Sequence, residues 1–173
     1  MKRYFKPLFF FVGFMGTGKT TVGKRVSEIL AFPYLDTDEL LEEKFQMTVS
    51  QYFYNYGEKE FRKEEKKLLQ DILLSTNKAI ISTGGGILLD NSNLDNIKLN
   101  GYVILVKASF QEISQRLKCC SSRPLLKSKG LECLFEERKK LYTFYDFEID
   151  TTSKDVDYVA MEVIPFILRK VGS

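Results

Sequence analysis

The chain has 173 residues, enough for a hydrophobic core of its own, and we predict a single domain over residues 1–173. With 44% hydrophobic and 28% charged residues, its composition excludes disordered and fibrous proteins. The net charge of +3 is spread without a basic block, which argues against nucleic-acid binding, and the absence of His excludes His-based triads and His metal ligands.

The first apolar run and the cysteines bear on location. Residues 8–12 are too few to span a bilayer, which takes about 20 apolar residues, and we interpret them as a buried strand. Cys119, Cys120 and Cys133 form no CxxC pair, so we expect reduced thiols rather than a disulfide framework or a zinc site. These patterns predict a cytoplasmic protein without membrane contact.

Five short apolar runs predict the strands of a parallel sheet. They lack the alternation of half-exposed strands, so both of their faces should be covered. Apolar residues recur at helical spacing between them, and alternating strands and helices favour an α/β fold with ligands beyond the carboxyl ends of the strands. The predicted strands are 8–12, 33–35, 79–82, 102–106 and 147–149, and the apolar helix faces are Val22, Val26, Ile29 and Leu30, then Phe61, Leu68, Leu69, Ile72 and Leu73, then Val156, Val159, Ala160, Val163, Ile167 and Leu168.

Residues Gly13 to Thr20 read GFMGTGKT and match the phosphate-loop pattern GxxxxGK[ST], between a predicted strand and a predicted helix. In this pattern, backbone N–H groups converge on phosphates, the lysine reaches the β- and γ-phosphates, and the Ser/Thr hydroxyl can bind Mg²⁺. The motif predicts a nucleoside triphosphate as ligand. ATP is favoured over GTP, because the nearest approach to the guanine-reading Asn-Lys-x-Asp motif, at 77–80, lacks the acid.

Two carboxylates, Asp36 and Asp38, follow the second predicted strand. An ATP site needs an acid near Mg²⁺, and the third strand ends at Ser82 without one. We interpret Asp36 and Asp38 as parts of one extended tail, in which Asp36 faces Mg²⁺ directly or through water and Asp38 faces an acceptor hydroxyl. The alternative is that both residues only cap the next helix.

Two stretches, about 36–60 and 119–131, are poor in core pattern, and we expect flaps over a site. The second stretch contains Arg123. Arg62 and Arg138 lie in charged helical segments, and a planar guanidinium suits carboxylate or phosphoryl groups, although each arginine alone fits a solvated surface better. Glu65 lies three residues after Arg62 and could orient it.

Taken in order, these motifs resemble those of the shikimate kinase family. The family pattern is a phosphate loop, Asp-Thr-Asp after the second strand, Phe-Arg-x-x-Glu, Gly-Gly-Gly, an Arg-Pro-Leu-Leu lid and an Arg-x-x-x-Tyr helix. Each motif after the loop is weak alone, but the ordered set is specific and spans most of the chain. The matching segments are 13–20, 36–38, 61–65, 84–86, 123–126 and 138–142.

The resemblance implies an α/β fold of the P-loop, nucleoside-monophosphate-kinase type: a five-stranded parallel sheet flanked by helices, with a substrate-binding segment at about 36–65 and a lid at about 119–131. It implies transfer of the γ-phosphoryl group of ATP to the 3-hydroxyl of shikimate, on the route to chorismate and the aromatic amino acids. Mg²⁺ would be the cofactor, ATP and shikimate the only partners, and the protein a monomer.

Residue by residue, the resemblance implies the following roles. Lys19, Asp38 and Arg123 would be catalytic, Asp38 by holding the acceptor hydroxyl. Thr20 and Asp36 would hold the metal ion. Shikimate would contact Asp38, Phe53, Phe61, Arg62, Gly84, Gly85, Gly86 and Arg138, and ATP would contact Gly13, Met15, Gly16, Thr17, Gly18, Lys19, Thr20, Thr21, Arg116 and Arg123.

Some features fit less well. Asp150-Thr151 is similar to the start of the family's adenine loop, but the following residues vary in the family, as do those of the lid. Lys139 and Lys140 add charge that the resemblance does not explain. Another P-loop kinase, acting on gluconate or a nucleoside monophosphate, and a non-catalytic ATP-binding module remain alternative interpretations.

Overall fold

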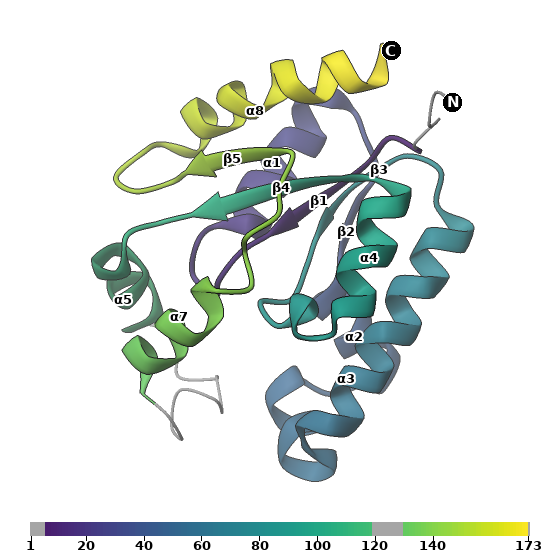
Figure 1. The fold of residues 1–173 in the computed structure, drawn as a ribbon, viewed down its shortest axis with the longest axis vertical. Coiled ribbons are helices and arrows are strands. Elements are labelled where there is room, and N and C mark those ends of the chain that lie inside the picture. Colours follow the sequence, from purple (N-terminus) through teal and green to yellow (C-terminus); the bar gives the residue numbers. More distant parts are fainter. Residues whose placement is uncertain (1–5, 119–129, 173) are drawn as a thin grey trace.

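The structure, a computed structural model, describes residues 6–118 and 130–172. Five parallel strands form one sheet in the order β2-β3-β1-β4-β5, as Figure 1 shows. This confirms the predicted α/β class and its parallel sheet. The carboxyl ends of β1, β2 and β3 therefore meet at one edge, where motifs distant in sequence come together. The strands are β1 (Leu8–Val12), β2 (Tyr34–Asp36), β3 (Ala79–Ser82), β4 (Tyr102–Lys107) and β5 (Phe147–Asp150).

Helices cover both faces of the sheet. One face packs against α1 (Lys19–Leu30) and α8 (Val156–Val171), and the other against α3 (Val49–Ser75), the short 3₁₀ helix η1 (Ile87–Leu89) and α4 (Asn91–Asn100). Three further helices complete the described chain: α2 (Thr37–Phe45), α5 (Phe110–Lys118) and α7 (Leu131–Lys139).

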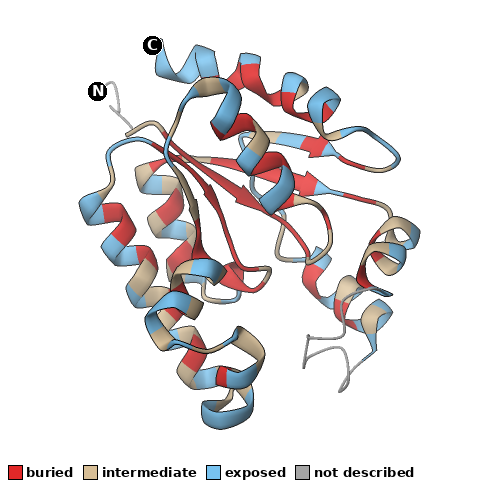
Figure 2. Ribbon diagram, turned by 180° about the vertical axis from the view of Figure 1, so that it is seen from behind, coloured by how far each residue is buried: buried red, intermediate tan, exposed pale blue. Residues whose placement is uncertain are grey.

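The central strand β1 shows how the sequence builds the core. Its side chains alternate between the two faces: Phe9 and Phe11 pack with α1 and α8, whereas Phe10 and Val12 pack with α3 and α4. Every residue of β1 is 1% exposed or less, which explains its continuous apolar run (Figure 2).

Two residues predicted on buried helix faces are exposed instead. Ile29 is 42% exposed and Leu168 is 51% exposed. Both lie close to the carboxyl-terminal end of their helix, α1 and α8 respectively, where solvent covers that side of the helix. The buried stripe is therefore narrower there than the sequence pattern predicted.

The stretch of about 36–60 is helical and packed. It comprises α2 and the first turns of α3, which share a small cluster of their own around Leu41, Tyr52 and Phe61. Because these residues pack in this separate cluster, their sequence lacks the apolar pattern of helices that pack against the main core. Within α3 the backbone departs from helical geometry at Gly57, with φ +82° and ψ 166°, a conformation that favours glycine. Most of the predicted lid, including Arg123, and also Cys119 and Cys120 lie outside the described residues.

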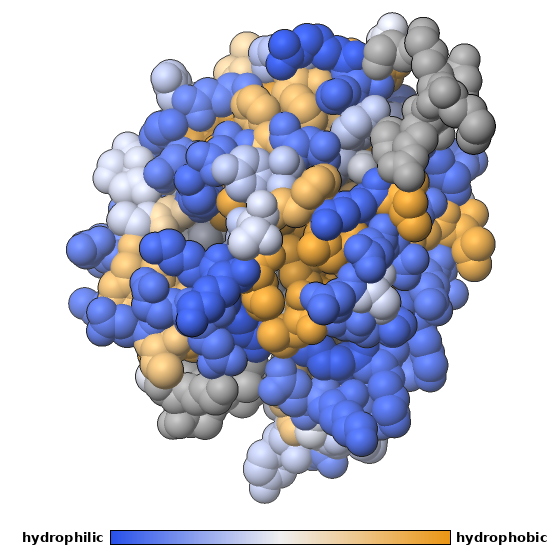
Figure 3. Space-filling view, in the orientation of Figure 1, coloured by the Kyte–Doolittle hydropathy of each residue, from blue (hydrophilic) through white to orange (hydrophobic). Residues whose placement is uncertain are grey.

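The surface is largely hydrophilic. In the face shown in Figure 3, apolar residues gather in a hollow near the centre, with hydrophilic residues on either side. Among the helices in the described ranges, none has the length and apolar character to cross a membrane.

Candidate active site

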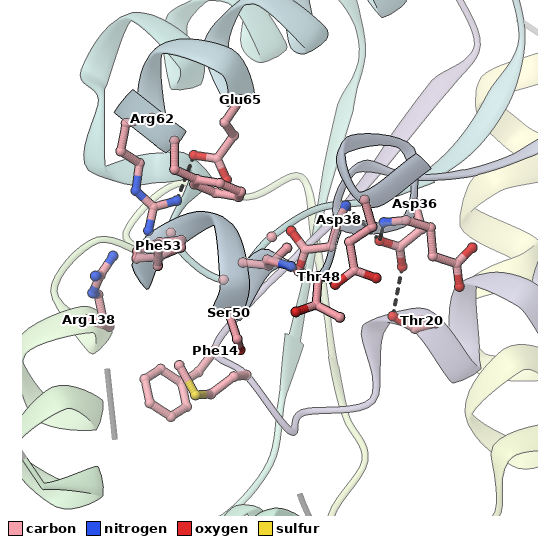
Figure 4. Close-up of a pocket in the computed structure, with 18 residues that line it drawn as sticks. Phe14, Thr20, Asp36, Asp38, Thr48, Ser50, Phe53, Arg62, Glu65 and Arg138 are labelled. Atoms are coloured by element: carbon pink, nitrogen blue, oxygen red, sulfur yellow. Dashed lines mark hydrogen bonds and ion pairs between the residues drawn. The ribbon is translucent and has the colours of Figure 1, made fainter. Parts of the chain in front are cut away.

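A pocket of about 490 Å³ lies at the carboxyl edge of the sheet, within the size range of small-ligand sites (Figure 4). Its walls come from the phosphate loop, the junction of β2 and α2, helix α3, the turn after β3, and α7. The pocket brings together these predicted site residues: Met15, Thr20, Asp36, Asp38, Phe53, Phe61, Arg62, Gly84, Gly85, Gly86 and Arg138. It also includes Phe14, Glu39, Glu42, Thr48, Val49 and Ser50, to which the sequence assigned no role.

The predicted phosphate loop connects β1 to α1, which begins at Lys19. The loop is closed by bonds to one carbonyl: the Thr17 hydroxyl donates to Phe14 O at 2.8 Å, and the Lys19 ammonium donates to the same oxygen at 2.9 Å. Lys19 is only 8% exposed, so its charge is held over the loop. Thr21 lies exposed in the first turn of α1 and does not line the pocket.

Asp36 both caps a helix and faces the phosphate loop. Its Oδ1 accepts from the backbone N–H groups of Asp38 (3.0 Å) and Glu39 (3.4 Å), which is the N-cap arrangement, while its Oδ2 accepts from the Thr20 hydroxyl at 2.9 Å. The expectation of an extended tail was wrong, because β2 ends at Asp36 and α2 begins at Thr37. Capping and facing the phosphate loop are therefore compatible rather than alternative.

The Thr20 hydroxyl and the Asp36 carboxylate fit a magnesium ion. Both offer hard oxygen atoms, and Mg²⁺ usually takes one or two protein oxygens together with substrate phosphates and water. The Tyr34 hydroxyl also donates to Asp36 Oδ2, at 3.1 Å, and burial raises the pKa of this tyrosine, so it stays a donor. Within residues 6–118 and 130–172, no group of three or more acidic or cysteine side chains could hold a metal ion.

The glycine turn after β3 lies against the predicted catalytic acid. The Gly84 N–H donates to the Thr37 hydroxyl at 2.9 Å. A Cβ atom on Gly84 would lie 2.6 Å from Asp38 Oδ1 and 2.9 Å from Glu65 Oε1, so only glycine lets both carboxylates reach this turn. The sequence predicted that a ligand approaches this glycine turn closely. In the structure, the side chains of Asp38 and Glu65 also do so.

Arg62 and Glu65 form the predicted pair, with Arg62 Nη1 donating to Glu65 Oε2 at 2.7 Å. Glu65 is 2% exposed. Burial raises the pKa of its carboxyl to about 7, with the charge of Asp38 adding to the rise and that of Arg62 opposing it. Glu65 therefore titrates near neutral pH while it holds the guanidinium.

Arg62 and Arg138 offer buried donors that lack acceptors. Arg138 is 7% exposed, and both guanidinium groups project toward the same part of the pocket (Figure 4). Within the described part of the chain, Arg62 Nε, Arg138 Nε and Arg138 Nη1 are buried without a hydrogen-bond partner. Since buried donors are normally satisfied, this pair is suited to a bound carboxylate.

Two aromatic rings form an apolar wall. The ring centroids of Phe53 and Phe61 lie 4.7 Å apart, and both residues line the pocket. The guanidinium carbon of Arg62 lies 5.3 Å from the Phe61 centroid. An apolar wall beside cationic donors suits a small ring that carries an anionic group.

Arg116 links the phosphate loop to the segment after β5. Its Nη1 donates to Gly16 O at 3.2 Å and to Thr151 Oγ1 at 3.0 Å, and the Thr151 hydroxyl donates to Thr17 O at 2.8 Å. Arg116 and Thr151, which the resemblance assigns to the adenine end of the site, therefore lie together beside the phosphate loop.

No role was predicted for Tyr142, although it ends the last motif. Its hydroxyl donates to Gly85 O at 2.9 Å and so joins α7 and its following residues to the glycine turn. A second pocket, of about 570 Å³, lies on the other side of Phe14, and Lys139 lines it together with Phe135 and Tyr142. Lys139, one of the two lysines the resemblance left unexplained, therefore borders a separate cavity.

The chain is similar to known proteins over most of its length. The family model for shikimate kinase matches residues 15–168. A shikimate kinase of Caldanaerobacter subterraneus subsp. tengcongensis is 41% identical over 164 residues, covering 92% of this chain and 95% of that protein. A shikimate kinase of Thermoanaerobacter pseudethanolicus is 39% identical over 161 residues, covering 91% and 94%.

Solved structures agree with this. Shikimate kinase from Acinetobacter baumannii in complex with shikimate superposes with a TM-score of 0.87 at 29% identity, covering 96% of this chain and 95% of that chain. A gluconokinase from Sinorhizobium meliloti 1021 reaches a TM-score of 0.60 at 11% identity, covering 96% and 94%, and shows a shared fold only.

Proposed function

The chain belongs to the shikimate kinase family and phosphorylates shikimate at the expense of ATP, and from this premise we propose how its own residues carry out the reaction. One observation carries the assignment of roles: a carboxylate, Asp38, and two guanidinium groups with unused buried donors share one pocket beside a phosphate loop. The chain is one domain in this proposal, with residues of about 36–65 binding the substrate.

The acceptor hydroxyl is held by Asp38. The carboxylate accepts a hydrogen bond from the 3-hydroxyl of shikimate and takes its proton as the bond to phosphorus forms. The close approach of Asp38 to Gly84 supports this role, because it holds the carboxylate against the glycine turn in the pocket that Thr20 also lines. Gly84 to Gly86 form the floor under the bound ring.

The substrate carboxylate is bound by Arg62 and Arg138, whose unpartnered donors it satisfies. Glu65 orients Arg62 through their 2.7 Å bond. Phe53 and Phe61 form the wall against the apolar face of the ring. These contacts would hold the acceptor hydroxyl of shikimate in place relative to the phosphate loop. Phosphoryl transfer depends on this positioning.

ATP is bound by the phosphate loop, with Lys19 leaving Phe14 O for the β- and γ-phosphates and Arg116 placed toward adenine. Thr20 and Asp36 would hold Mg²⁺, which would neutralise charge on the phosphates. Arg123, outside the described residues, adds a further cation to the transferred group. We infer a cytoplasmic monomer without nucleic-acid or membrane partners. Sedimentation velocity at micromolar concentration would test the monomer, which should sediment as a 20.0 kDa species.

A coupled assay of ADP release with ATP and Mg²⁺ tests the proposal. Shikimate should be phosphorylated in preference to gluconate and AMP. Preference for either of these, or ATP binding without shikimate-dependent ADP release, would overturn it.

A further inference from the structure

Glu58 lies between the two arginines that are proposed to bind the substrate carboxylate. Its Oε1 accepts from Arg62 Nη2 at 3.2 Å and lies 3.8 Å from Arg138 Nη2. A single carboxylate oxygen thus faces both guanidinium groups from within the protein. No motif of the sequence pointed to this residue.

This contact satisfies the arginines only in part. Arg62 Nε, Arg138 Nε and Arg138 Nη1 stay buried without a partner in the described part of the chain. The 3.8 Å separation from Arg138 is an ion pair beyond hydrogen-bond distance. A small free carboxylate with two oxygens could satisfy donors on both arginines at once, which Glu58 does not do.

Glu58 is also free to leave. Its side chain is 42% exposed, compared with 20% for Arg62 and 8% for Arg138, so water can solvate the carboxylate once it moves. It directly follows Gly57, where the helical geometry of α3 is interrupted. The charged partner that can withdraw is therefore the acid, whereas the arginines are held by burial and by Glu65.

We propose that Glu58 is an internal competitor for the carboxylate-binding position, which it occupies in the absence of substrate and yields to the carboxylate of shikimate. The proposal rests on the assignment of Arg62 and Arg138 as carboxylate ligands. Before the substrate binds, Glu58 offsets part of the positive charge of Arg62 and Arg138. Shikimate binding includes the breaking of this contact, so Glu58 lowers the affinity for substrates that carry a carboxylate.

Equilibrium titration by calorimetry tests this with shikimate and with its carboxamide, which keeps the ring and hydroxyls but has no negative charge. In Glu58→Gln and Glu58→Ala, the dissociation constant of shikimate should fall about three- to fivefold, since an exposed competing ion pair is removed. The carboxamide should bind wild type and both variants within about twofold of each other, because it cannot exploit the freed donors.

Glu60→Gln is the matched control. Glu60 lies on the same helix, is 43% exposed and pairs with Lys63 at 2.7 Å, so its removal should leave both dissociation constants unchanged. Weaker shikimate binding in the Glu58 variants would overturn the proposal, because it would show that Glu58 supports Arg62. Unchanged binding would also overturn it. The same gain in Glu60→Gln, or equal gains for the carboxamide, would overturn it as a non-specific charge effect.

The proposed function fails in a different way. If wild type binds shikimate and its carboxamide equally, the arginines do not bind a carboxylate, and both proposals fall. If wild type strongly prefers shikimate but the Glu58 variants show no gain, only the competition is wrong.

Discussion

Asp38 and Glu65 are two acids with different surroundings at the same glycine turn. Both line the pocket beside the phosphate loop, but Glu65 is almost fully buried and is bonded to Arg62. The two share a neighbour, since both carboxylates lie close to where a Cβ of Gly84 would be. In the proposed function, Asp38 therefore holds the acceptor hydroxyl and Glu65 orients an arginine.

Replacing Asp38 by Asn should remove turnover and leave nucleotide binding intact. The amide cannot take the hydroxyl proton, so kcat should fall about 10²–10⁴-fold. The affinity for ADP should stay within about twofold, because the phosphate loop is built from residues 13–20. Steady-state kinetics and ADP titration give the two values. Glu39→Gln is the control, since Glu39 lines the same pocket but pairs with Lys24 at 2.7 Å; equal loss of ADP binding in Asp38→Asn would contradict the role.

The buried carboxyl of Glu65 should make the stability of the protein depend on pH. Its folded pKa of about 7 exceeds the unfolded value, so the folded state binds more protons between these values. The stabilisation is complete below about pH 4.5 and is lost as pH rises through 7, by about 3 kcal/mol at most. Urea unfolding at pH 5 and pH 8 should show a smaller decrease in Glu65→Gln than in wild type.

Glu64→Gln controls for this experiment. Contacts with Lys44 and Lys67 lower the pKa of Glu64, so its contribution to the pH dependence has the opposite sign. If stability decreases equally in wild type and Glu65→Gln between pH 5 and pH 8, then Glu65 is already ionised at pH 5 in the folded protein.

At the scale of elements, the site depends on where strands end and helices begin. β2 passes directly into α2 at Asp36, so one residue ends a strand, caps a helix and faces Thr20. The turn between β3 and η1 is narrow because Asp38 and Arg62 lie against it; a Cβ on Gly86 would come within 2.3 Å of Arg62 Nη2. The turn and the helices are therefore fitted to each other by side chains of the site.

Gly84→Ala should impair catalysis without unfolding the protein. The new methyl would lie 2.6 Å from Asp38 Oδ1 and must displace that carboxylate or the turn. We expect kcat/KM for shikimate to fall at least tenfold, with ADP affinity and the unfolding midpoint little changed. Gly85→Ala is the milder comparison, since its nearest neighbour, Met15 N, is 3.3 Å away. Equal kinetics for Gly84→Ala and wild type would show that Asp38 is not fixed by this contact.

The whole molecule joins two half-sites across one sheet edge. In the proposed function, the nucleotide half is formed by β1, α1 and Arg116 of α5, and the substrate half by α2, α3, the glycine turn and Arg138 of α7. The parallel strand order places β1 between β3 and β4, so the two halves meet at Phe14, Thr20 and Asp36.

Ligand-linked stability should separate the two halves. With Mg²⁺ and ADP at about 100 times its dissociation constant, the free energy of unfolding should rise by about 2.7 kcal/mol. Lys19→Met should lose most of this increase, because Lys19 supplies the ammonium of the phosphate loop, while the increase produced by shikimate alone persists. Thermal unfolding with each ligand measures both effects. A Lys19→Met protein that loses both increases alike would indicate damage to the fold.

The features that were predicted correctly from the sequence are those that a local pattern of residues determines. The phosphate loop, the parallel sheet and the Arg62–Glu65 pair follow from spacing along a few residues, and all are present. Contacts between distant segments were not predictable: Tyr142 reaches Gly85 and Gly84 reaches Thr37 only because the fold brings those segments together. Glu58 was hidden in a charge-rich stretch, where nothing distinguishes one glutamate from its neighbours.

The direction of the chain has a practical consequence. β1 starts near Lys6 at the amino edge of the sheet, and α8 runs back from the carboxyl edge to end at Val171, so both described ends lie away from the pocket (Figure 1). A fluorophore or a tether to a sensor chip attached next to either described end would leave the mouth of the pocket open to the reactants.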